Sequence, residues 1–367
     1  MSKNDSQLDR KLLVSPETSV SEAMSALDAA AEGFLLVVNE EGRLIGSLND
    51  GDIRRYILKT GGIKGKVKDC TNFSPICVQD NTGIGAIKQL MIDKQIKYVP
   101  IIDAHNRIIE IVTWSKVFKS ARKKVYDELN VPVVIMAGGK GSRLEPFTKI
   151  LPKPLIPIGE KPVIQIIMDK FHSQGVSNFH LILNYKGNLI KSYLESNNKS
   201  DYNINFIWED SYLGTAGGLK YLPENISEPF IISNCDITVE TDFHELVDYH
   251  LSNGNDLSIV GSFVKHKLPY GVLHFQENGD LNEIAEKPEY DFTINTGIYV
   301  LKRNCLNYIP PNREYHITDL VSDLLKKGRK VGVFPVSEKS FIDIGQWEEY
   351  RKNVSFFDNS KEDFKSL

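Results

Sequence analysis

Residues Val131 to Leu155 read VPVVIMAGGKGSRLEPFTKILPKPL, and the architecture of most of the chain can be built outward from this stretch. Its apolar run Val133–Met136 is typical of a parallel strand that is covered on both faces. Glycines at positions 138, 139 and 141 then leave out the β-carbon where the chain must turn sharply, so backbone N–H groups can approach a ligand closely. The stretch therefore predicts a buried strand that ends in a turn able to cradle phosphates.

Cationic side chains accompany this glycine turn. Lys140 and Arg143 lie within the turn. Lys149 and Lys153 follow within ten residues, so a polyanion bound there would meet ammonium and guanidinium donors. A surface loop with solvated cations would account for the glycines equally well. The P-loop pattern does not occur here, and Leu144 replaces the third glycine of the dinucleotide fingerprint, so NAD binding is not expected.

The composition is that of a protein with substantial cores and no evident attraction to polyanions. The 367 residues are 41% hydrophobic and 25% charged, which allows two or three domains. A net charge of −4 gives no reason to expect nucleic-acid binding. The apolar runs are too short to span a bilayer, and the polar start has no signal-peptide core, so we expect a cytoplasmic protein without membrane contact. The four cysteines form neither a CxxC pair nor a metal cluster with histidines, so we expect reduced thiols.

The first third of the chain repeats itself at a constant offset of 64 residues. Each copy is predicted to form a helix, starting near Ser19 or Thr82, then a strand, a polar turn, a second strand and another helix. The repeat resembles a tandem pair of CBS motifs over about residues 10–122, with copies at about 10–62 and 74–122. The matched positions are Val20, Ala23, Leu27, Leu35, Val37, Val38, Arg43, Leu44 and Ile45 with Ile84, Ile87, Met91, Val99, Ile101, Ile102, Arg107, Ile108 and Ile109.

The resemblance to CBS motifs implies a possible regulatory nucleotide. In that family a Thr or Ser followed three residues later by Asp commonly binds the ribose and phosphate of an adenine nucleotide. The first copy offers Asn49 and Asp52, whereas the second offers Thr113 but Lys116 in place of the carboxylate. Nucleotide sensing and a structural or dimerising role both stay open. Because tandem CBS pairs often associate face to face, we expect a homo-oligomer.

The motif at residues 136–155, MAGGKGSRLEPFTKILPKPL, resembles the opening motif of the sugar-1-phosphate nucleotidyltransferases, (L/M)AGGxGxRLxPLTxxxPKPLxP. The resemblance covers residues 131–355. Together with the CBS resemblance of the repeat, it implies a CBS pair over residues 1–125, a nucleotidyltransferase domain over 131–355 and a tail over 356–367. Further family motifs follow in register: LGTAGG at 213–218, ISNCD at 232–236, EKP at 286–288, NTGIY at 295–299 and FIDIG at 341–345.

The order of segments after the glycine turn predicts an α/β fold. Apolar spacing alternates between helix and strand, so we expect a Rossmann-like mixed, mostly parallel sheet flanked by helices. Ligands should lie at the carboxyl ends of its strands. The expected segments are helices over 162–174 and 188–196, strands over 179–183 and 204–208, and later strands at 256–264, 271–275 and 298–301 that extend the sheet and carry a sugar pocket.

The chemistry of nucleotidyl transfer brings two polyanions together, so repulsion is the main obstacle. A protein can promote the reaction by aligning the reactants and by placing cations, of which Mg²⁺ is the strongest, where negative charge gathers. Asp236 follows the apolar strand 230–233, and Asp343 follows another apolar stretch. The resemblance implies that both carboxylates bind Mg²⁺. Without the resemblance, either Asp would be read as a turn or cap residue.

The resemblance also implies roles for the other motif residues. Arg143 would neutralise the β- and γ-phosphates, Lys153 would contact the α-phosphate, and Asp236 would complete the catalytic set. Cys235 departs from the family, which has glycine there, and we expect a tolerated small residue that is not a nucleophile. The implied nucleotide-binding residues are Ala137, Gly138, Gly139, Gly141, Glu209 and Gly214, and the implied sugar-phosphate-binding residues are Gly271, Glu286, Lys287, Asn295 and Thr296.

The nucleobase and the sugar are less defined. The motifs GTAGGL, YGVLHF and EKP resemble the mannose-1-phosphate guanylyltransferase branch, associated with surface polysaccharide or glycan precursors, which favours GTP. Glu209 could accept hydrogen bonds from the N1–H and N2–H₂ edge of guanine, but a thymine or uracil N3–H would also suit it. Thymidylyl, uridylyl and cytidylyl transfer stay open, as do mannose, glucosamine and heptose phosphates. Two rival hypotheses are a catalytically inactive regulatory relative and a nucleotide-sensing CBS protein.

Overall fold

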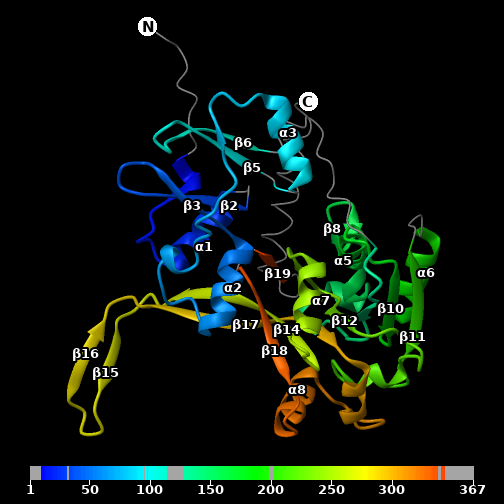
Figure 1. Ribbon diagram of the computed structural model, residues 1–367. Helices are drawn as coiled ribbons and strands as arrows, with labels where there is room; N and C mark the ends of the chain where they lie inside the picture. The colour runs from blue at the N-terminus through cyan, green and yellow to red at the C-terminus, as the bar shows by residue number, and fades with distance from the viewer. Residues whose placement is uncertain are drawn as a thin grey trace. The chain divides into compact units, whose positions relative to one another are not determined.

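The computed structural model describes residues 10–30, 33–94, 96, 98–113, 128–197, 202–337 and 340–343. The chain divides into two compact units, Met1–Val125 and Tyr126–Leu367 (Figure 1). The predicted tail 356–367, the end of the FIDIG motif and Lys116 lie outside the described residues. In the part that is described, no helix combines the length and apolar character needed to cross a membrane.

The N-terminal unit contains two copies of a helix followed by an antiparallel pair of strands. Each of these elements has bounds in the second copy that lie 64 residues beyond those in the first, so the predicted repeat is confirmed for the first helix and both strands. The helix predicted after the second strand of the second copy lies outside the described residues. The elements are α1 (Val20–Ala29), β2 (Phe34–Val38) and β3 (Leu44–Asn49) in the first copy, and α3 (Ile84–Asp93), β5 (Tyr98–Ile102) and β6 (Ile108–Thr113) in the second.

The two copies pack around equivalent residues. The rings of Phe34 and Tyr98, which are 64 residues apart, stack with centroids 3.5 Å from each other. Arg43 and Arg107 form an antiparallel bridge, again between equivalent positions. The unit therefore has an approximate two-fold arrangement. A short strand, β1 (Leu13–Val14) or β4 (Val78–Gln79), runs parallel to β2 or β5, and α2 (Asp50–Thr60) follows β3.

The C-terminal unit is built on a seven-stranded mixed sheet. Its first four strands in space are parallel to one another, and β14 and β18 form a further parallel pair, with β17 antiparallel to both of its neighbours. In spatial order the strands are β11 (Asn203–Trp208), β10 (Asn178–Leu183), β7 (Val133–Met136), β12 (Phe230–Asn234), β17 (Glu289–Leu301), β14 (Leu257–Lys267) and β18 (Val331–Val336).

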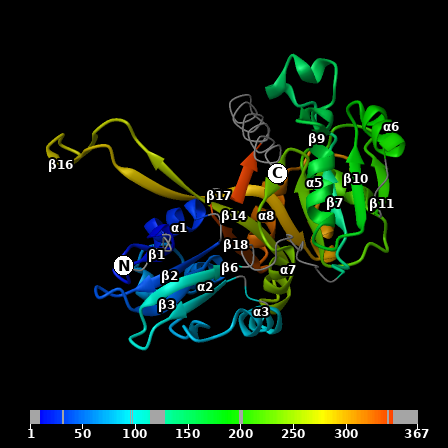
Figure 2. The ribbon, with the colours of Figure 1, turned by 90° about the horizontal axis from the view of Figure 1, so that it is seen from above.

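Helices cover both faces of this sheet, and each face has its own apolar core (Figure 2). On one face, Ile164, Ile167 and Phe171 of α5 point into the core at helical spacing. The predicted α/β class is thereby confirmed. The helices are α5 (Val163–His172), α6 (Gly187–Asn197) and α7 (Phe243–Ser252) on one face, and the 3-10 helices η6 (Gly217–Tyr221) and η7 (Arg303–Tyr308) with α8 (Ile317–Lys326) on the other.

The later strands are longer than the sequence predicts. β14 reaches Lys267 and β17 begins at Glu289, whereas the apolar pattern indicated only 256–264 and 298–301. The added part of β17 has no apolar run because polar and apolar residues alternate along 289–295, and it is held by pairing with β14. The described residues of the unit also form three short pairs: β8 (Pro157–Ile158) with β9 (Lys161–Pro162), β13 (Ile237–Val239) with β19 (Phe341–Asp343), and β15 (Val272–Phe275) with β16 (Leu281–Ala285).

Candidate active site

The parallel strands β11, β10, β7 and β12 end at one edge of the sheet, and the residues singled out from the sequence follow three of them. The glycine turn follows β7, Glu209 comes directly after β11, and Asp236 lies two residues after β12. Because parallel strands present their carboxyl ends together, these groups share one edge. The candidate site is at this edge.

The glycine turn folds back onto the later part of its own segment. Gly141 has a φ of 67°, and a β-carbon there would lie 2.9 Å from Cβ of Lys153 and 3.0 Å from Cγ2 of Thr148. Any other residue would be strained and too close to the chain that carries Lys153. Arg143 lies on the 3-10 helix η3 (Ser142–Leu144) and is exposed.

Lys186 ties this turn to the end of β10. Its ammonium group donates to three consecutive carbonyl oxygens, those of Thr148 at 3.3 Å, Lys149 at 2.5 Å and Ile150 at 2.9 Å. Lys186 has a φ of 53°, which is uncommon for a residue with a side chain. The sequence analysis missed this residue. Its one signal was its position just after a strand that ends at the site edge.

Lys153 and Asp236 form an ion pair across 83 residues of sequence. The ammonium group donates to Oδ2 of the carboxylate, and only 15% and 17% of the two side chains are exposed. Two of the three residues implied as catalytic are therefore in direct contact. Removing one partner would leave a largely buried charge unpaired, which is costly.

Asp343 lies on the strand next to Asp236. β13 and β19 pair so that Asp343 is opposite Ile237, the residue that follows Asp236. Two carboxylates on neighbouring strands fit Mg²⁺, which prefers hard oxygen ligands from one or two carboxylates together with phosphates. No cluster of three His, Cys, Asp or Glu side chains that could hold a metal occurs among the described residues. Substrate oxygens would therefore have to complete the coordination.

Glu209 is enclosed by two glycines. β-Carbons at Gly138 and Gly218 would lie 2.7 and 2.2 Å from its carboxylate oxygens, so only glycine leaves room for the side chain. The residue is 5% exposed, and Oε1 has no hydrogen-bond partner in the described structure. This burial raises the pKa of Glu209 to about 7. An acid group kept at the site edge with an unsatisfied oxygen is suited to bind a ligand that donates hydrogen bonds.

Gly214 lies in the segment after β11, five residues beyond Glu209. It has a φ of 80°, and a β-carbon there would lie 2.7 Å from the carbonyl oxygen of Tyr315. The hydroxyl of the next residue, Thr215, accepts from the N–H of Ile317 at the start of α8 at 3.0 Å. The segment after β11 is thus fixed against the start of α8.

The NTG turn approaches the loop that carries Asp236. Gly297 has a φ of 84°, and a β-carbon there would lie 2.5 Å from Nδ2 of Asn234. Asn295 donates to the hydroxyl of Tyr299 at 2.7 Å and accepts from the N–H of Gly297. The Thr296 hydroxyl is buried and donates to the carbonyl of a neighbouring strand at 2.8 Å, so its side chain has a structural partner.

The other residues implied for sugar-phosphate binding lie away from the edge of the sheet that carries Asp236. Gly271 and Glu286 meet where β15 and β16 begin and end, and a β-carbon at Gly271 would lie 3.1 Å from Oε2 of Glu286. Lys287 lies beside them, with 59% of its side chain exposed, against 72% for Glu286. From the first residue of β17, Glu289, to Asn295 the chain is extended, which corresponds to roughly 20 Å at about 3.3 Å per residue. The structure therefore does not bring Lys287 and Asn295 to one pocket.

The Cys235 side chain is buried beside Asp236. Burial raises the pKa of its thiol to about 12, so the thiolate that a nucleophile would need is disfavoured. Cys235 thus behaves as a small core residue at the position where glycine was expected from the family pattern.

The proposed regulatory residues of the first CBS copy already have partners. Asn49 caps α2, and its side chain accepts from the N–H of Asp52 while Asp52 Oδ2 accepts from the N–H of Asn49. Oδ1 of Asp52 accepts from Arg55. Both carboxylate oxygens therefore serve a capping box and an ion pair. Thr113 is 5% exposed at the end of β6.

A cavity of about 740 Å³ lies away from the candidate site. It is lined by residues such as Asn178 and His180, near the start of β10, and Pro132, just before β7. These positions are at the amino ends of the strands, opposite the edge with Asp236. We therefore do not include this cavity in the site.

Comparisons with known proteins match both parts of the chain to families. The nucleotidyl transferase family model matches residues 132–360, and the CBS domain model matches residues 8–59 and 67–123. Among solved structures, the crystal structure of HddC from Yersinia pseudotuberculosis matches with a TM-score of 0.50 and 31% identity, over 62% of this chain and 99% of that chain.

Similar curated proteins act on different nucleotides. A mannose-1-phosphate guanyltransferase of Yarrowia lipolytica is 35% identical over 184 residues, which is 48% of this chain and 50% of that protein. A UTP--glucose-1-phosphate uridylyltransferase of Synechocystis sp. is 29% identical over 238 residues, 59% of this chain and 61% of that protein. The chain thus spans about half to three fifths of the length of these relatives.

Proposed function

Because the chain belongs to the nucleotidyl transferase family, we propose that it joins a nucleoside triphosphate to a sugar 1-phosphate, forming a nucleotide-diphospho-sugar and pyrophosphate. The observation that carries this proposal is the contact between Lys153 and Asp236. The Lys153 ammonium group and the Asp236 carboxylate, which is suited to bind a metal, meet at the edge of the sheet where the glycine turn follows β7. An inactive relative would have no need to keep these charges largely buried and paired.

The residues of the donor half have separate tasks in this proposal. The glycine turn would offer backbone N–H groups to the triphosphate, with Arg143 free to swing onto its β- and γ-phosphates from an exposed helix. Lys153 would hold the α-phosphate, whose phosphorus is attacked. Asp236 and Asp343 would hold Mg²⁺, which when bound neutralises phosphate charge. The protein thereby aligns two anions for an in-line displacement.

Glu209 supports GTP as the favoured donor. When ionised, its two oxygens can accept from both N1–H and N2–H₂ of guanine, whereas uracil or thymine presents a single N3–H. A donor that satisfies the buried carboxylate would favour its charged form, so base binding and ionisation of Glu209 would be coupled. The similar proteins include both a guanyltransferase and a uridylyltransferase, so thymidylyl, uridylyl and cytidylyl transfer remain alternatives.

The acceptor in this proposal is a sugar 1-phosphate such as mannose or glucosamine 1-phosphate. Lys287 would contact its phosphate and Glu286 its hydroxyl groups, with Gly271, Asn295 and the Thr296 backbone completing the pocket. Because Lys287 and Asn295 are apart in the present arrangement, acceptor binding would require the intervening strands to bend. The product would serve the synthesis of surface polysaccharides or glycan precursors.

A panel of four triphosphates against several sugar 1-phosphates, read as pyrophosphate release in the presence of Mg²⁺, tests the proposal. We expect the highest kcat/KM for GTP. Release with another triphosphate in preference to GTP would keep the transferase assignment and overturn the choice of base. No release from any pair, by protein whose folding is verified by circular dichroism, would overturn the assignment itself.

For the CBS pair we propose a structural role that supports a homo-oligomer. The capping box and ion pair of Asp52 favour this role over ribose binding, because both of its oxygens are already used. Calorimetric titration of the full chain with AMP and with ATP, in the presence of excess GTP analogue to fill the catalytic site, distinguishes the two. Saturable heat that is lost in Asp52→Ala would establish nucleotide sensing instead.

A further inference from the structure

The cavity of about 740 Å³ at the amino ends of the strands lies apart from the candidate active site, and the proposed reaction does not use it. Its walls come from the chain just before β7, from β10 and β11, and from the end of η6 with the segment that follows. Small-molecule sites in proteins usually have volumes of about 300–1,000 Å³. The cavity is therefore large enough to hold a small ligand.

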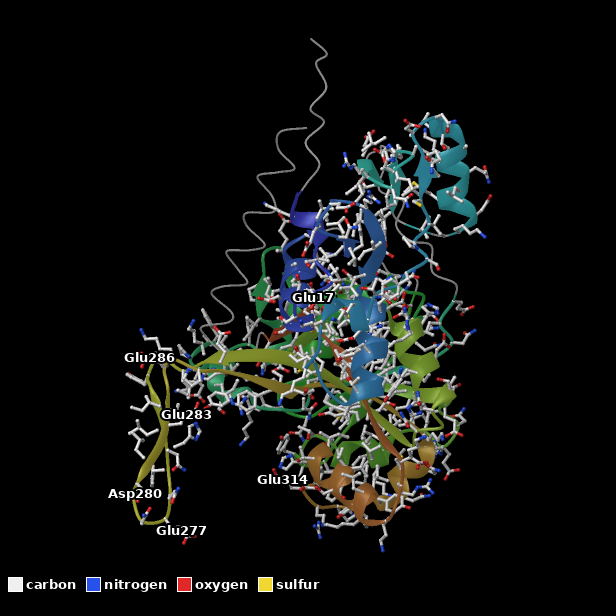
Figure 3. All side chains as sticks on the ribbon, turned by 60° about the vertical axis from the view of Figure 1, so that its left-hand side comes forward. Glu17, Glu277, Asp280, Glu283, Glu286 and Glu314 are labelled. Carbon is white, nitrogen blue, oxygen red and sulfur yellow. The ribbon has the colours of Figure 1, made fainter. Side chains whose placement is uncertain are left out.

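The lining of this cavity is polar but uncharged. Among the described residues that line it there is no Asp, Glu, Lys or Arg. Acidic side chains gather elsewhere in the unit, for example Glu277, Asp280 and Glu283 on the hairpin of β15 and β16 (Figure 3). A phosphate or carboxylate in the cavity would lack a cation to pair with, and a cationic ligand would lack a carboxylate. The cavity is thus suited to a neutral ligand.

His180 is a buried polar side chain in the wall of the cavity. It is 8% exposed, and its Nδ1 has no hydrogen-bond partner in the described structure. Burial lowers the pKa of the ring, so the imidazole is neutral, with one nitrogen as a donor and the other as an acceptor. Because buried polar groups nearly always have partners, the unsatisfied ring indicates a ligand that can both donate and accept hydrogen bonds.

Four asparagine side chains surround the same space. Asn130 precedes β7, Asn178 begins β10, Asn205 is on β11 and Asn225 follows η6. Asn205 pairs with His180 in the parallel register, so these two side chains lie on the same face of the sheet. An amide carries both donors and an acceptor, as a hydroxyl group does. Because the four amides come from separate segments, they would meet ligand hydroxyls that point in several directions.

Apolar surface from Ile207, Ile226 and the ring of Tyr221 completes the lining. The CH groups of a sugar ring can pack on such surface while its hydroxyls point outward in several directions, whereas a flat nucleobase has its polar groups in one plane. We propose that this cavity binds a neutral saccharide, a free monosaccharide or disaccharide, with His180 and the surrounding amides as its hydrogen-bonding groups.

Saturation-transfer NMR of the full chain with mannose, glucose, N-acetylglucosamine and sucrose tests this site. We expect transfer to at least one of these sugars, and its loss in Asn205→Trp, where a large side chain at an exposed position of β11 would fill the cavity. Asn188→Trp is the matched control, because Asn188 is exposed on α6, on the other face of the sheet. This variant should bind like the unchanged protein.

His180→Phe tests the hydrogen bonds, because the new ring is of similar size and has no nitrogen. Titration of the sugar that binds should show about fivefold weaker affinity, the change expected for the loss of one neutral hydrogen bond. Circular dichroism verifies that this buried substitution leaves the fold in place. The exposed Asn205→Trp gives an independent result if it does not.

No transfer to any of the sugars, or equal transfer in Asn205→Trp and the unchanged protein, would overturn the proposal. Transfer that excess mannose 1-phosphate abolishes would also overturn it, since a phosphorylated sugar has no cation to meet in the cavity. Binding of the uncharged nucleosides guanosine or uridine in place of the sugars, lost in Asn205→Trp, would refute the ligand class. Because pyrophosphate release is not measured, failure here would leave the proposed transferase activity unaffected.

Discussion

Two side chains, Lys153 and Asp236, account for much of the charge chemistry that the candidate site can offer. Each neutralises the other while both are largely withdrawn from water. In the proposed reaction, substrate phosphates would take over the ammonium group and Mg²⁺ would take over the carboxylate. The ion pair thus neutralises both charges until substrate and metal would replace it with stronger contacts.

We expect Asp236→Asn to lower the rate of pyrophosphate release by about 10²- to 10³-fold, the loss typical when one electrostatic contribution to a transition state is removed. Initial rates at saturating Mg²⁺ measure the effect. Asp248→Asn is the matched control, because Asp248 is exposed on α7. A rate equal to that of the unchanged protein would remove Asp236 from the reaction.

The raised pKa of Glu209 predicts how the free energy of unfolding depends on pH. Burial raises its pKa from 4.5 to about 7, so the folded protein binds this proton more tightly than the unfolded chain does. The resulting stabilisation is complete below the unfolded pKa and is lost as the pH rises through about 7. Glu209→Gln stays neutral, so its free energy of unfolding relative to the unchanged protein should increase by about 1–3 kcal/mol between about pH 5 and about pH 8.

Urea unfolding of both proteins at these two pH values measures that difference. Glu224→Gln serves as a control, because Glu224 is exposed and follows the same 3-10 helix η6 that carries Gly218. A difference between Glu209→Gln and the unchanged protein that does not vary with pH would mean that Glu209 is ionised with its ordinary pKa.

The sequence could predict the edge at which Glu209 and Asp236 lie because each follows an apolar strand, and parallel strands end together. It could not predict Lys186. The role of this lysine depends on a left-handed backbone that aims its ammonium group at carbonyls 36 to 38 residues earlier in the chain. Such a contact has no periodicity and leaves no pattern in the neighbouring sequence.

The segment 148–150, against which the glycine turn packs through Thr148, is held by this lysine. With Lys186→Met, the carbonyls of 148–150 lose their shared donor, so this segment and the glycine turn packed against it should open more often. We expect trypsin to cleave after Arg143 and Lys149 several-fold faster than in the unchanged protein, read by mass spectrometry of the fragments. Lys191→Met on α6 is the control. Unchanged cleavage in Lys186→Met would show that the turn is held by its own packing.

The strand β17 is the element for which the sequence was least informative. Its inner part, 298–301, is apolar and was predicted. Its outer part, 289–295, alternates polar residues with Tyr290, Phe292 and Ile294, a strand pattern that a search for apolar runs does not find. Its pairing with β14 identifies it as a strand in the structure. Glu286 and Lys287 precede the first residue of β17, and Asn295 lies six residues into that extended strand, so the motif spacing could not indicate their separation.

At the scale of the whole chain, the repeat in the sequence predicted a separate N-terminal unit, and the structure divides the chain after Val125. Because the second CBS copy follows the first at an unbroken offset, the limits of its helix and strands could be read from the first copy. The packing of the two copies could not, since the Phe34 and Tyr98 stack pairs residues that differ in type. Each unit has its own core, formed from its own residues.

Separate cores predict two transitions in calorimetric unfolding of the full chain. Phe34 is 1% exposed in the N-terminal unit and Phe171 is 2% exposed in the C-terminal unit. Phe34→Ala and Phe171→Ala should each cost about 3–5 kcal/mol, the range for deleting a buried aromatic side chain. Each substitution is therefore expected to lower the Tm of one transition by several degrees and to leave the other in place, with the two variants acting as controls for each other. If both transitions moved together in either variant, the units would unfold as one cooperative body, and the cores would be coupled in energy although they are separate in composition.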